Sequence, residues 1–369
     1  MNLLSALTKR TGAATRAAVV LLGFALGPRR GPLALLSRSP VVHEVSYQAD
    51  SDTIRADVYR PHDDLRHPGV IIVHGIAAQG KDDPRIRRLA ISLASAGYVV
   101  LAPQLERLAR GELSPSDREP VVAGFQYLCQ QDYIVKQRVG MAGFCVSAAL
   151  VLLAAEDQRI SKQVAVVSSW GTYYDVRDLI EAVVTQSYTY RGETKAWKPA
   201  ANIGPALKHI VIQLMPSSSD RAILTRLLEE EPPSQGDSSD PGLKMLSPSV
   251  QAVYRLFSGP HPDEVRALWP KLDPELYQCL LDLSPSSGIQ QLQTKVVIVH
   301  GLGDGTVPYV ESLKLSDALG DERRAYVDVF RFFDHVNPEM SRIRLSTLHK
   351  ATSDIVKFYI FFYRILCQL

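Results

Sequence analysis

The fold of this chain is decided by the stretch RVGMAGFCVSAALVLLAA, residues 138–155. A short apolar run leads into Gly143-Phe144-Cys145-Val146-Ser147, and a helix-like run of alanine, leucine and valine follows. A nucleophile at a sharp strand-to-helix turn needs small residues two places before it and two places after it, because the backbone turns tightly there. Gly143 and Ser147 occupy these places around Cys145. The pattern is G-x-C-x-S, in which cysteine replaces the usual serine and serine replaces the usual last glycine.

Short apolar runs alternate with helical patterns along most of the chain. Val41–Tyr47 and Thr53–Tyr59 alternate polar and apolar residues around an Asp-Ser-Asp turn, which predicts an antiparallel hairpin. After it, strands separated by helices are expected at 70–73, 98–101, 138–142, 164–167, 296–299 and 326–332, with a long helix at 339–369. Strands that alternate with helices predict an α/β fold with a doubly wound, mostly parallel sheet.

One long interval interrupts this alternation. Between Trp170 and Ile289, helical patterns are separated by proline, serine and glycine clusters, which predicts a helical cap inserted between two strands. The expected organisation is a leader over residues 1–40, a core formed by residues 41–170 and 287–369, and a cap over residues 171–286. Several aromatic residues are attributed to the core in preference to a substrate pocket: Trp170, Tyr173, Tyr174, Tyr188, Tyr190 and Trp197.

The leader carries an apolar run, Ala17–Leu26, between basic residues. This run is shorter than the roughly 20 apolar residues that a membrane-spanning helix needs. Its basic, acid-free composition fits a helix packed on the core, a targeting sequence, or a helix lying on a membrane surface. The sequence leaves these alternatives open, so contact with a membrane surface through residues 1–40 stays among the expected interactions.

Bulk composition narrows the classes of function. The 369 residues are 46% hydrophobic and 22% charged with a net charge of +2, which is typical of a globular protein and does not indicate a nucleic-acid partner. No C-x-x-C pair or metal-ligand spacing links the four cysteines, which are Cys129, Cys145, Cys279 and Cys367. We therefore expect no metal site. A reducing, cytoplasmic location is favoured over a targeted or membrane-associated one.

Cys145 needs a base, and the base needs a group that orients it. A glycine-rich loop follows the expected strand at 296–299 and places Asp304 at the carboxyl edge of the sheet, where ligands gather in open α/β folds. His335 follows the last expected strand at the same edge. The chain order Cys145, Asp304, His335 is one in which a nucleophile, an acid and a histidine form a catalytic triad.

A tetrahedral intermediate needs about two backbone N–H donors. One donor is expected from Val146, the residue after the nucleophile. The other is expected from the loop His74-Gly75-Ile76-Ala77 after an early strand, with the Ile76 amide as first candidate and Gly75 as second. His74 itself is assigned a structural role.

These motifs resemble the α/β-hydrolase superfamily, and the cysteine elbow is similar to that of the dienelactone hydrolase group. The likeness is carried by His74–Arg85, the elbow, residues 300–308 and the DHVNP segment at 334–338. It covers residues 41–170 and 287–369. The resemblance implies hydrolysis of a small carboxylic ester or lactone through an acyl-enzyme intermediate, without a metal or organic cofactor. Dienelactone hydrolases are smaller than this chain and lack so large an insertion.

A cysteine nucleophile changes the expected substrates. Free thiols titrate near pH 8.5, and both the helix N-terminus and a neighbouring His335 favour the thiolate form of Cys145. A thiolate is also a good leaving group, so unactivated esters and amides are expelled less readily than the sulfur. We therefore expect activated substrates, namely lactones, enol esters, aryl esters or thioesters.

Several alternatives remain open at this point. Cys145 could be a buried apolar residue, Ser147 could be the nucleophile, and Asp334 could orient His335 in place of Asp304. At the level of function, one alternative is a ligand-binding protein that keeps a hydrolase fold without catalysis. Another is an acyltransferase that passes the acyl group to an acceptor other than water.

Overall fold

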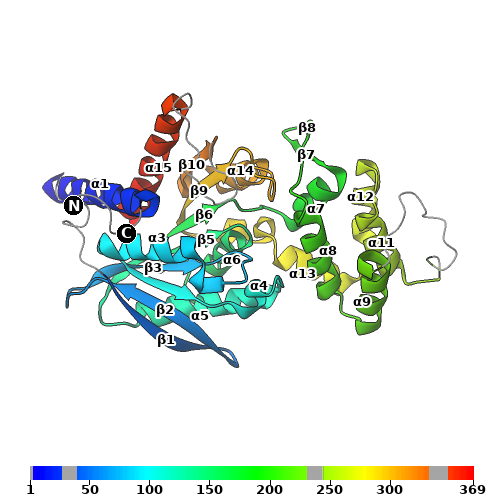
Figure 1. Cartoon of the computed structure of the whole chain (residues 1–369), viewed down its shortest axis with the longest axis horizontal. Coiled ribbons are helices and arrows are strands. Elements are labelled where there is room, and N and C mark those ends of the chain that lie inside the picture. The colour runs from blue at the N-terminus through cyan, green and yellow to red at the C-terminus, as the bar shows by residue number, and fades with distance from the viewer. Residues whose placement is uncertain (1–2, 27–39, 231–242, 244, 332–347) are drawn as a thin grey trace.

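The computed structural model describes residues 3–26, 40–230, 243, 245–331 and 348–369. Figure 1 shows a twisted sheet with helices on both faces and a further group of helices beside it. The sheet has eight strands in the order β1-β2-β4-β3-β5-β6-β9-β10. Their bounds are β1 (Val41–Ala49), β2 (Asp52–Arg60), β3 (His67–Val73), β4 (Val99–Pro103), β5 (Ile134–Phe144), β6 (Val164–Trp170), β9 (Lys295–Gly301) and β10 (Arg324–Phe330).

The strand directions confirm the predicted fold. β1 pairs antiparallel with β2, and β2 pairs antiparallel with β4, whereas the other neighbours are parallel. The register aligns the carboxyl ends of the central strands, because Val73 of β3 pairs with Gly143 of β5 and Phe144 of β5 pairs with Trp170 of β6. The loops that leave these strands therefore start at one edge of the sheet.

Helices cover both faces of the sheet, as the alternation of strands and helices predicts. One face packs against α5 (Arg118–Cys129), α6 (Val146–Ala155) and α14 (Val310–Arg323). The other face packs against α3 (Pro84–Ser95) and α15 (Leu348–Gln368). Along β3 the buried side chains alternate between these two faces, as expected for a strand covered on both sides. The long helix expected at 339–369 is present from Leu348 onward, and the part of that prediction before it lies outside the described residues.

The beginning of α3 has the capping pattern that Asp83 followed by Pro84 indicates in the sequence. Asp83 is the N-cap and its side chain accepts a hydrogen bond from the Arg85 amide at 2.8 Å, while Pro84 occupies the first helical position. Gly97 follows the helix with a φ of 91°, a conformation that glycine adopts without steric cost. The chain then enters β4, which a short helix, α4 (Glu106–Ala109), follows.

The leader forms a helix, α1 (Leu3–Leu26), that lies against α3 and α15. Ala13, Ala17, Val20 and Phe24 share one helical face and are buried. The Tyr359 hydroxyl of α15 also donates to the Ala14 carbonyl at 3.3 Å. No helix in the described part of the chain is long and apolar enough to cross a membrane.

A run of helices lies between β6 and β9, in the interval where an inserted cap is predicted. Three of them, α9, α12 and α13, match the helical patterns that the sequence shows at 220–228, 262–269 and 274–283. The sequence did not predict α7, α8, α11 or the hairpin β7–β8. The hairpin turns at Arg191 and Gly192, both with positive φ. The bounds are α7 (Val176–Thr185), β7 (Ser187–Tyr190), β8 (Glu193–Ala196), α8 (Ile203–Leu214), α9 (Ser218–Thr225), α11 (Pro248–Phe257), α12 (Pro262–Leu268) and α13 (Pro274–Asp282).

The two ends of this insertion are joined to each other by hydrogen bonds. The Tyr173 hydroxyl donates to the Leu283 carbonyl at 3.1 Å, and the Ser286 hydroxyl donates to Asp175 Oδ2 at 2.7 Å. Glu311 of α14 accepts from the Asp175 amide, which ties the same point to the core. The insertion thus leaves and re-enters the core at a single polar junction.

A partly buried glutamate at the end of α6 makes stability depend on pH. Burial raises the pKa of Glu156 to about 8, and its Oε1 atom has no hydrogen-bond partner among the described residues. Between about pH 4.5 and pH 8, the folded chain keeps a proton here that the unfolded chain releases. The free energy of unfolding therefore falls as pH rises through this window and levels off above it.

We predict that Glu156→Gln removes this loss of stability. The amide has the shape of the protonated acid and does not ionise, so the variant should exceed the parent at pH 9 by on the order of 2 kcal/mol. Urea unfolding between pH 5 and pH 9 measures the difference. Glu193→Gln, at a side chain that is 72% exposed, is the matched control and should leave the pH profile unchanged. Parallel profiles for the parent and Glu156→Gln would contradict the prediction.

Candidate functional site

Cys145 sits at the turn between β5 and α6 with a φ of 56° and a ψ of −126°. For a residue with a Cβ, such a backbone conformation costs on the order of 1–3 kcal/mol. The conformation persists only when the surrounding structure enforces it. The Cys145 amide donates to the Trp170 carbonyl at 2.8 Å, which ties the turn to the end of β6. This is the strained strand-to-helix turn that the G-x-C-x-S pattern predicts.

The two small residues of the pattern allow this turn for different reasons. A Cβ on Gly143 would collide with the carbonyl oxygen of Ser147, so only glycine fits there. The Ser147 hydroxyl accepts a hydrogen bond from the Phe144 amide at 2.8 Å and lies 2.8 Å from the Val73 carbonyl, to which it can donate. Because Ser147 is fully buried and hydrogen-bonded within the turn, its hydroxyl is a structural group.

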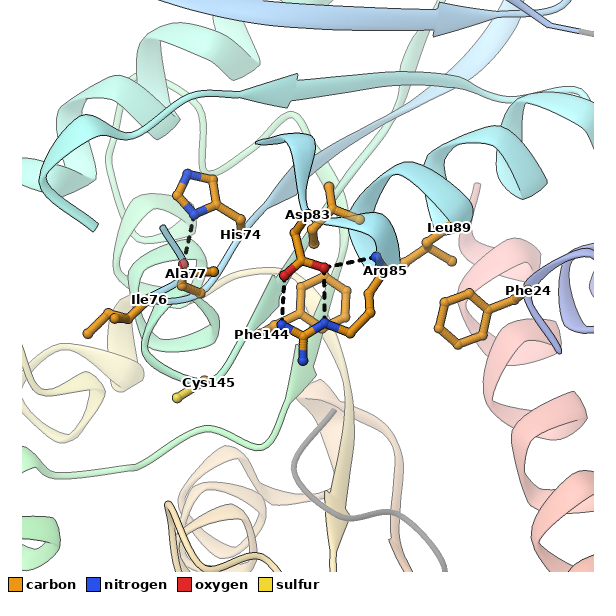
Figure 2. Close-up of a pocket in the computed structure, with 11 residues that line it drawn as sticks. Phe24, His74, Ile76, Ala77, Asp83, Arg85, Leu89, Phe144 and Cys145 are labelled. Carbon is orange, nitrogen blue, oxygen red and sulfur yellow. Dashed lines mark hydrogen bonds and ion pairs between the residues drawn. The ribbon is translucent and has the colours of Figure 1, made fainter. Parts of the chain in front are cut away.

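The Cys145 side chain is partly exposed and borders a cavity of about 90 Å³. The cavity lies between the elbow, the loop after β3, and helices α3 and α1, as Figure 2 shows. Its walls are mostly apolar, with one acid–arginine pair. The lining residues are Phe24, His74, Gly75, Ile76, Ala77, Asp83, Arg85, Ile86, Leu89, Phe144 and Cys145.

His74 fixes the orientation of the loop that carries the expected oxyanion donor. Its Nε2 atom accepts from the Leu105 amide at 3.1 Å, so the ring proton is on Nδ1, which donates to the Gly75 carbonyl at 2.7 Å. Burial lowers the pKa of His74, which favours this neutral form. The structural role predicted for His74 agrees with these contacts.

The orientation of Gly75 determines where the Ile76 amide points. In a trans peptide the carbonyl and the following N–H point in opposite directions, and the described chain has no cis peptide. The carbonyl of Gly75 faces His74, so the Ile76 N–H faces away from it. Figure 2 shows His74 on one side of Ile76 and Cys145 on the other. Val146 is the first residue of α6, so its amide has no acceptor within the helix.

Asp304 lies in the loop after β9, where the sequence places it, and is buried. Its Oδ1 atom accepts from the amides of Thr306 at 2.7 Å and Val307 at 3.1 Å, which stabilise the carboxylate. The Leu302 amide of the same loop donates to the Phe330 carbonyl at 2.7 Å. The acid loop is thereby joined to the end of β10, the strand after which His335 follows in the sequence.

One contact of Asp304 was not predicted from the sequence. His300 Nε2 is 3.3 Å from Asp304 Oδ2 and 3.0 Å from the Val307 carbonyl, and its Nδ1 is 2.7 Å from the Ser312 hydroxyl. The His300 side chain is fully buried. Both ring nitrogens are engaged inside the fold, and one of them contacts the Asp304 carboxylate. The H-x-x-x-D spacing at 300–304 is the sequence pattern from which this contact could have been predicted.

The insertion also holds the acid loop. The Trp197 indole N–H donates to the Asp304 carbonyl at 3.0 Å, and the Ala200 amide donates to the Gly305 carbonyl at 2.7 Å. Trp170 and Tyr173 are buried, which agrees with their assignment to the core. Trp197 is only partly buried, and its contact with the acid loop was missed because the two residues are far apart in the sequence.

His335 and the alternative acid Asp334 lie outside the described residues, so the triad stays a prediction at those positions.

The described part of the chain contains no group of three or more histidine, cysteine or acidic side chains that could hold a metal ion. Two of the expected site residues, Cys145 and Val146, lie next to each other in the elbow. The cavity brings Cys145 together with Ile76.

Comparisons with known proteins bear on the fold and on part of the sequence. Residues 54–187, which include the elbow, match the dienelactone hydrolase family. A search of the curated proteins found no match. Among solved structures, the chain is similar to the 2,6-dihydroxy-pseudo-oxynicotine hydrolase, with 14% identity, a TM-score of 0.52, and coverage of 89% of this chain and 68% of that one.

The uncomplexed acylaminoacyl peptidase of Pyrococcus horikoshii is also similar, with 13% identity and a TM-score of 0.50. The match covers 89% of this chain but only 42% of the peptidase, so the chain spans about two fifths of that protein's length. At these identities the structural likeness shows the fold.

The mostly parallel sheet, the strained elbow at its edge and the partial family match define an α/β-hydrolase fold. Residues 54–187, less than half of the chain, are similar to the dienelactone hydrolase family, and this similarity supports an enzyme of the hydrolase class.

We predict that Ser147→Ala destabilises the protein without removing the reactive thiol. The substitution leaves the buried Phe144 amide without its acceptor, which should lower the free energy of unfolding by about 1–3 kcal/mol. Urea unfolding measures this loss, and iodoacetamide labelling followed by peptide mass spectrometry should still modify Cys145. Complete loss of hydrolysis in a folded Ser147→Ala variant would instead identify Ser147 as the nucleophile.

Proposed function

We propose that the enzyme hydrolyses a carboxylic ester, lactone or thioester with Cys145 as nucleophile, His335 as base and Asp304 as the acid that orients it. The observation that carries this proposal is the position of Cys145. Its thiol is held in a strained elbow, at the N-terminus of α6, and borders a cavity that also includes the Gly75–Ile76 loop. Strained backbone of this kind concentrates at functional sites.

The proposed reaction proceeds in two steps. His335 takes the proton of Cys145, the thiolate attacks the carbonyl carbon, and the amides of Ile76 and Val146 donate to the oxyanion. The carbon–oxygen bond to the leaving group, or its carbon–sulfur bond in a thioester, then breaks, and the leaving group takes the proton from His335. A water molecule, deprotonated by His335, attacks the thioester of the acyl-enzyme. Collapse of this second intermediate releases the acid and restores the thiol.

The thiol favours activated substrates in this scheme. When the tetrahedral intermediate collapses, the better leaving group departs, and a thiolate leaves more readily than an unactivated alkoxide. Lactones, enol esters, aryl esters and thioesters therefore suit the site better than alkyl esters or amides. The insertion between β6 and β9, which contacts the acid loop through Trp197, is proposed as the cap of this site.

We predict that Cys145→Ala abolishes hydrolysis of p-nitrophenyl acetate. The loss in kcat should be at least about a thousandfold, because the covalent step disappears. Cys129→Ala is the matched control: burial raises the pKa of that thiol to about 11, so it stays protonated, and its removal should leave kcat unchanged. His335→Gln should lower kcat comparably to Cys145→Ala. Activity that survives Cys145→Ala would rule out the proposed nucleophile, and ester products formed with added alcohols would indicate acyl transfer.

We predict that His74→Ala lowers kcat and leaves KM nearly unchanged. The Gly75–Ile76 peptide loses the contact that orients it, so the oxyanion loses one well-aligned donor, an effect on the order of 10–100-fold. Steady-state kinetics with p-nitrophenyl acetate measure the change in kcat and the change in KM separately. His67→Ala, at another histidine that bonds a backbone carbonyl, is the control and should change neither parameter. A His74→Ala variant with raised KM and normal kcat would contradict the assignment.

A further inference from the structure

We propose that Phe24 of α1 closes the far end of the cavity beside Cys145 and restricts the enzyme to short, uncharged, apolar acyl groups. This inference rests on the proposed function, because it assigns the acyl-binding part of the same site. Phe24 is only 5% exposed and lines the same cavity as Cys145. Figure 2 shows the two residues at opposite ends of the set, with Arg85 and Leu89 between them.

Helix packing fixes the position of Phe24. It follows Ala13, Ala17 and Val20 on the buried face of α1, so the ring is part of a continuous helix contact. A Cβ on Gly23 would lie 2.9 Å from the Ser92 hydroxyl oxygen, which shows that α1 approaches α3 closely next to Phe24. The ring is therefore held as a wall of the cavity.

The size of the cavity sets the length of the acyl group. Its volume of about 90 Å³ is smaller than the roughly 150 Å³ of an apolar cavity that accommodates benzene. An acyl chain bonded to the Cys145 sulfur would run along the side chains of Phe144 and Leu89 and meet Phe24. Acetyl to butyryl groups fit this space, whereas an octanoyl chain exceeds it.

The two charged side chains of the cavity, Asp83 and Arg85, form an ion pair and add no net charge to it. The Arg85 guanidinium donates to Asp83 Oδ1 at 3.0 Å and to Oδ2 at 2.7 Å, a bidentate ion pair. This pair lowers the pKa of Asp83, so the carboxylate stays ionised and neutralises Arg85. Ile86, Leu89 and Phe144 supply apolar walls. A neutral apolar acyl group therefore matches the lining better than a charged one.

The first test compares p-nitrophenyl acetate, butyrate and octanoate in the parent and in Phe24→Ala. Removing the ring extends the cavity, so kcat/KM for octanoate relative to acetate should rise at least about tenfold. Leu22→Ala, at a position on the same helix that is 42% exposed, is the matched control and should leave this ratio unchanged. A series of aryl acetates with larger alcohol groups should show no such dependence on Phe24. A rise in that series alone would mean that the cavity binds the alcohol side and would overturn the proposal.

The second test does not depend on turnover. Alkyl methanethiosulfonates transfer their alkylthio group to a thiolate, forming a disulfide and releasing sulfinate. Peptide mass spectrometry then gives the rate at Cys145 for methyl and octyl reagents. Phe24→Ala should raise the octyl rate relative to the methyl rate at least about fivefold. Where Phe24→Ala fails to fold, as seen by thermal unfolding, Phe24→Leu replaces it with a smaller expected shift in the same direction.

The two tests separate the two proposals. A length dependence in thiol labelling without any ester hydrolysis would keep the role of Phe24 as a cavity wall and reject the acyl-hydrolase function. Ester hydrolysis with identical chain-length profiles in the parent, Phe24→Ala and Phe24→Leu would keep the function and overturn the role of Phe24.

Discussion

The backbone of Cys145 is the constraint on which the site depends. Its positive φ is unfavourable for any residue with a side chain, and neighbouring groups hold it in place. Gly143 leaves room for the carbonyl of Ser147, the Ser147 hydroxyl bonds the Phe144 amide, and the Trp170 carbonyl receives the Cys145 amide. The same turn starts α6, so the sulfur stands at the positive end of a helix dipole.

Three parts of the chain surround this turn: the core, the insertion between β6 and β9, and the leader. The core supplies the elbow and the His74 loop, while the insertion reaches the acid loop through Trp197. The leader contributes Phe24 to the cavity. A helix that composition alone could assign to targeting or to a membrane surface is therefore also part of the surroundings of the thiol, because its apolar face is buried against α3 and α15.

Features set by neighbouring residues could be predicted from the sequence. The elbow, the Asp83 cap and the alternation of strands and helices depend on residues a few places apart, and the structure has all of them. Contacts between distant segments could not be predicted, as with Trp197 and Asp304 or with Phe24 and the cavity. The β7–β8 hairpin was missed because its strands are short and mostly polar, which gives little hydrophobic alternation. The position of His335 relative to Cys145 stays a prediction.

The polar junction that joins both ends of the insertion has a consequence for how such a chain can change. Since Tyr173 meets Leu283 and Asp175 meets Ser286, the chain departs from the sheet and returns to it at nearly one place. The entropic cost of closing a loop grows only with the logarithm of its length. Segments between these anchors can therefore be lengthened, shortened or exchanged with little effect on the register of β6 and β9. Changes within the insertion and folding of the sheet are, to that extent, free to evolve separately.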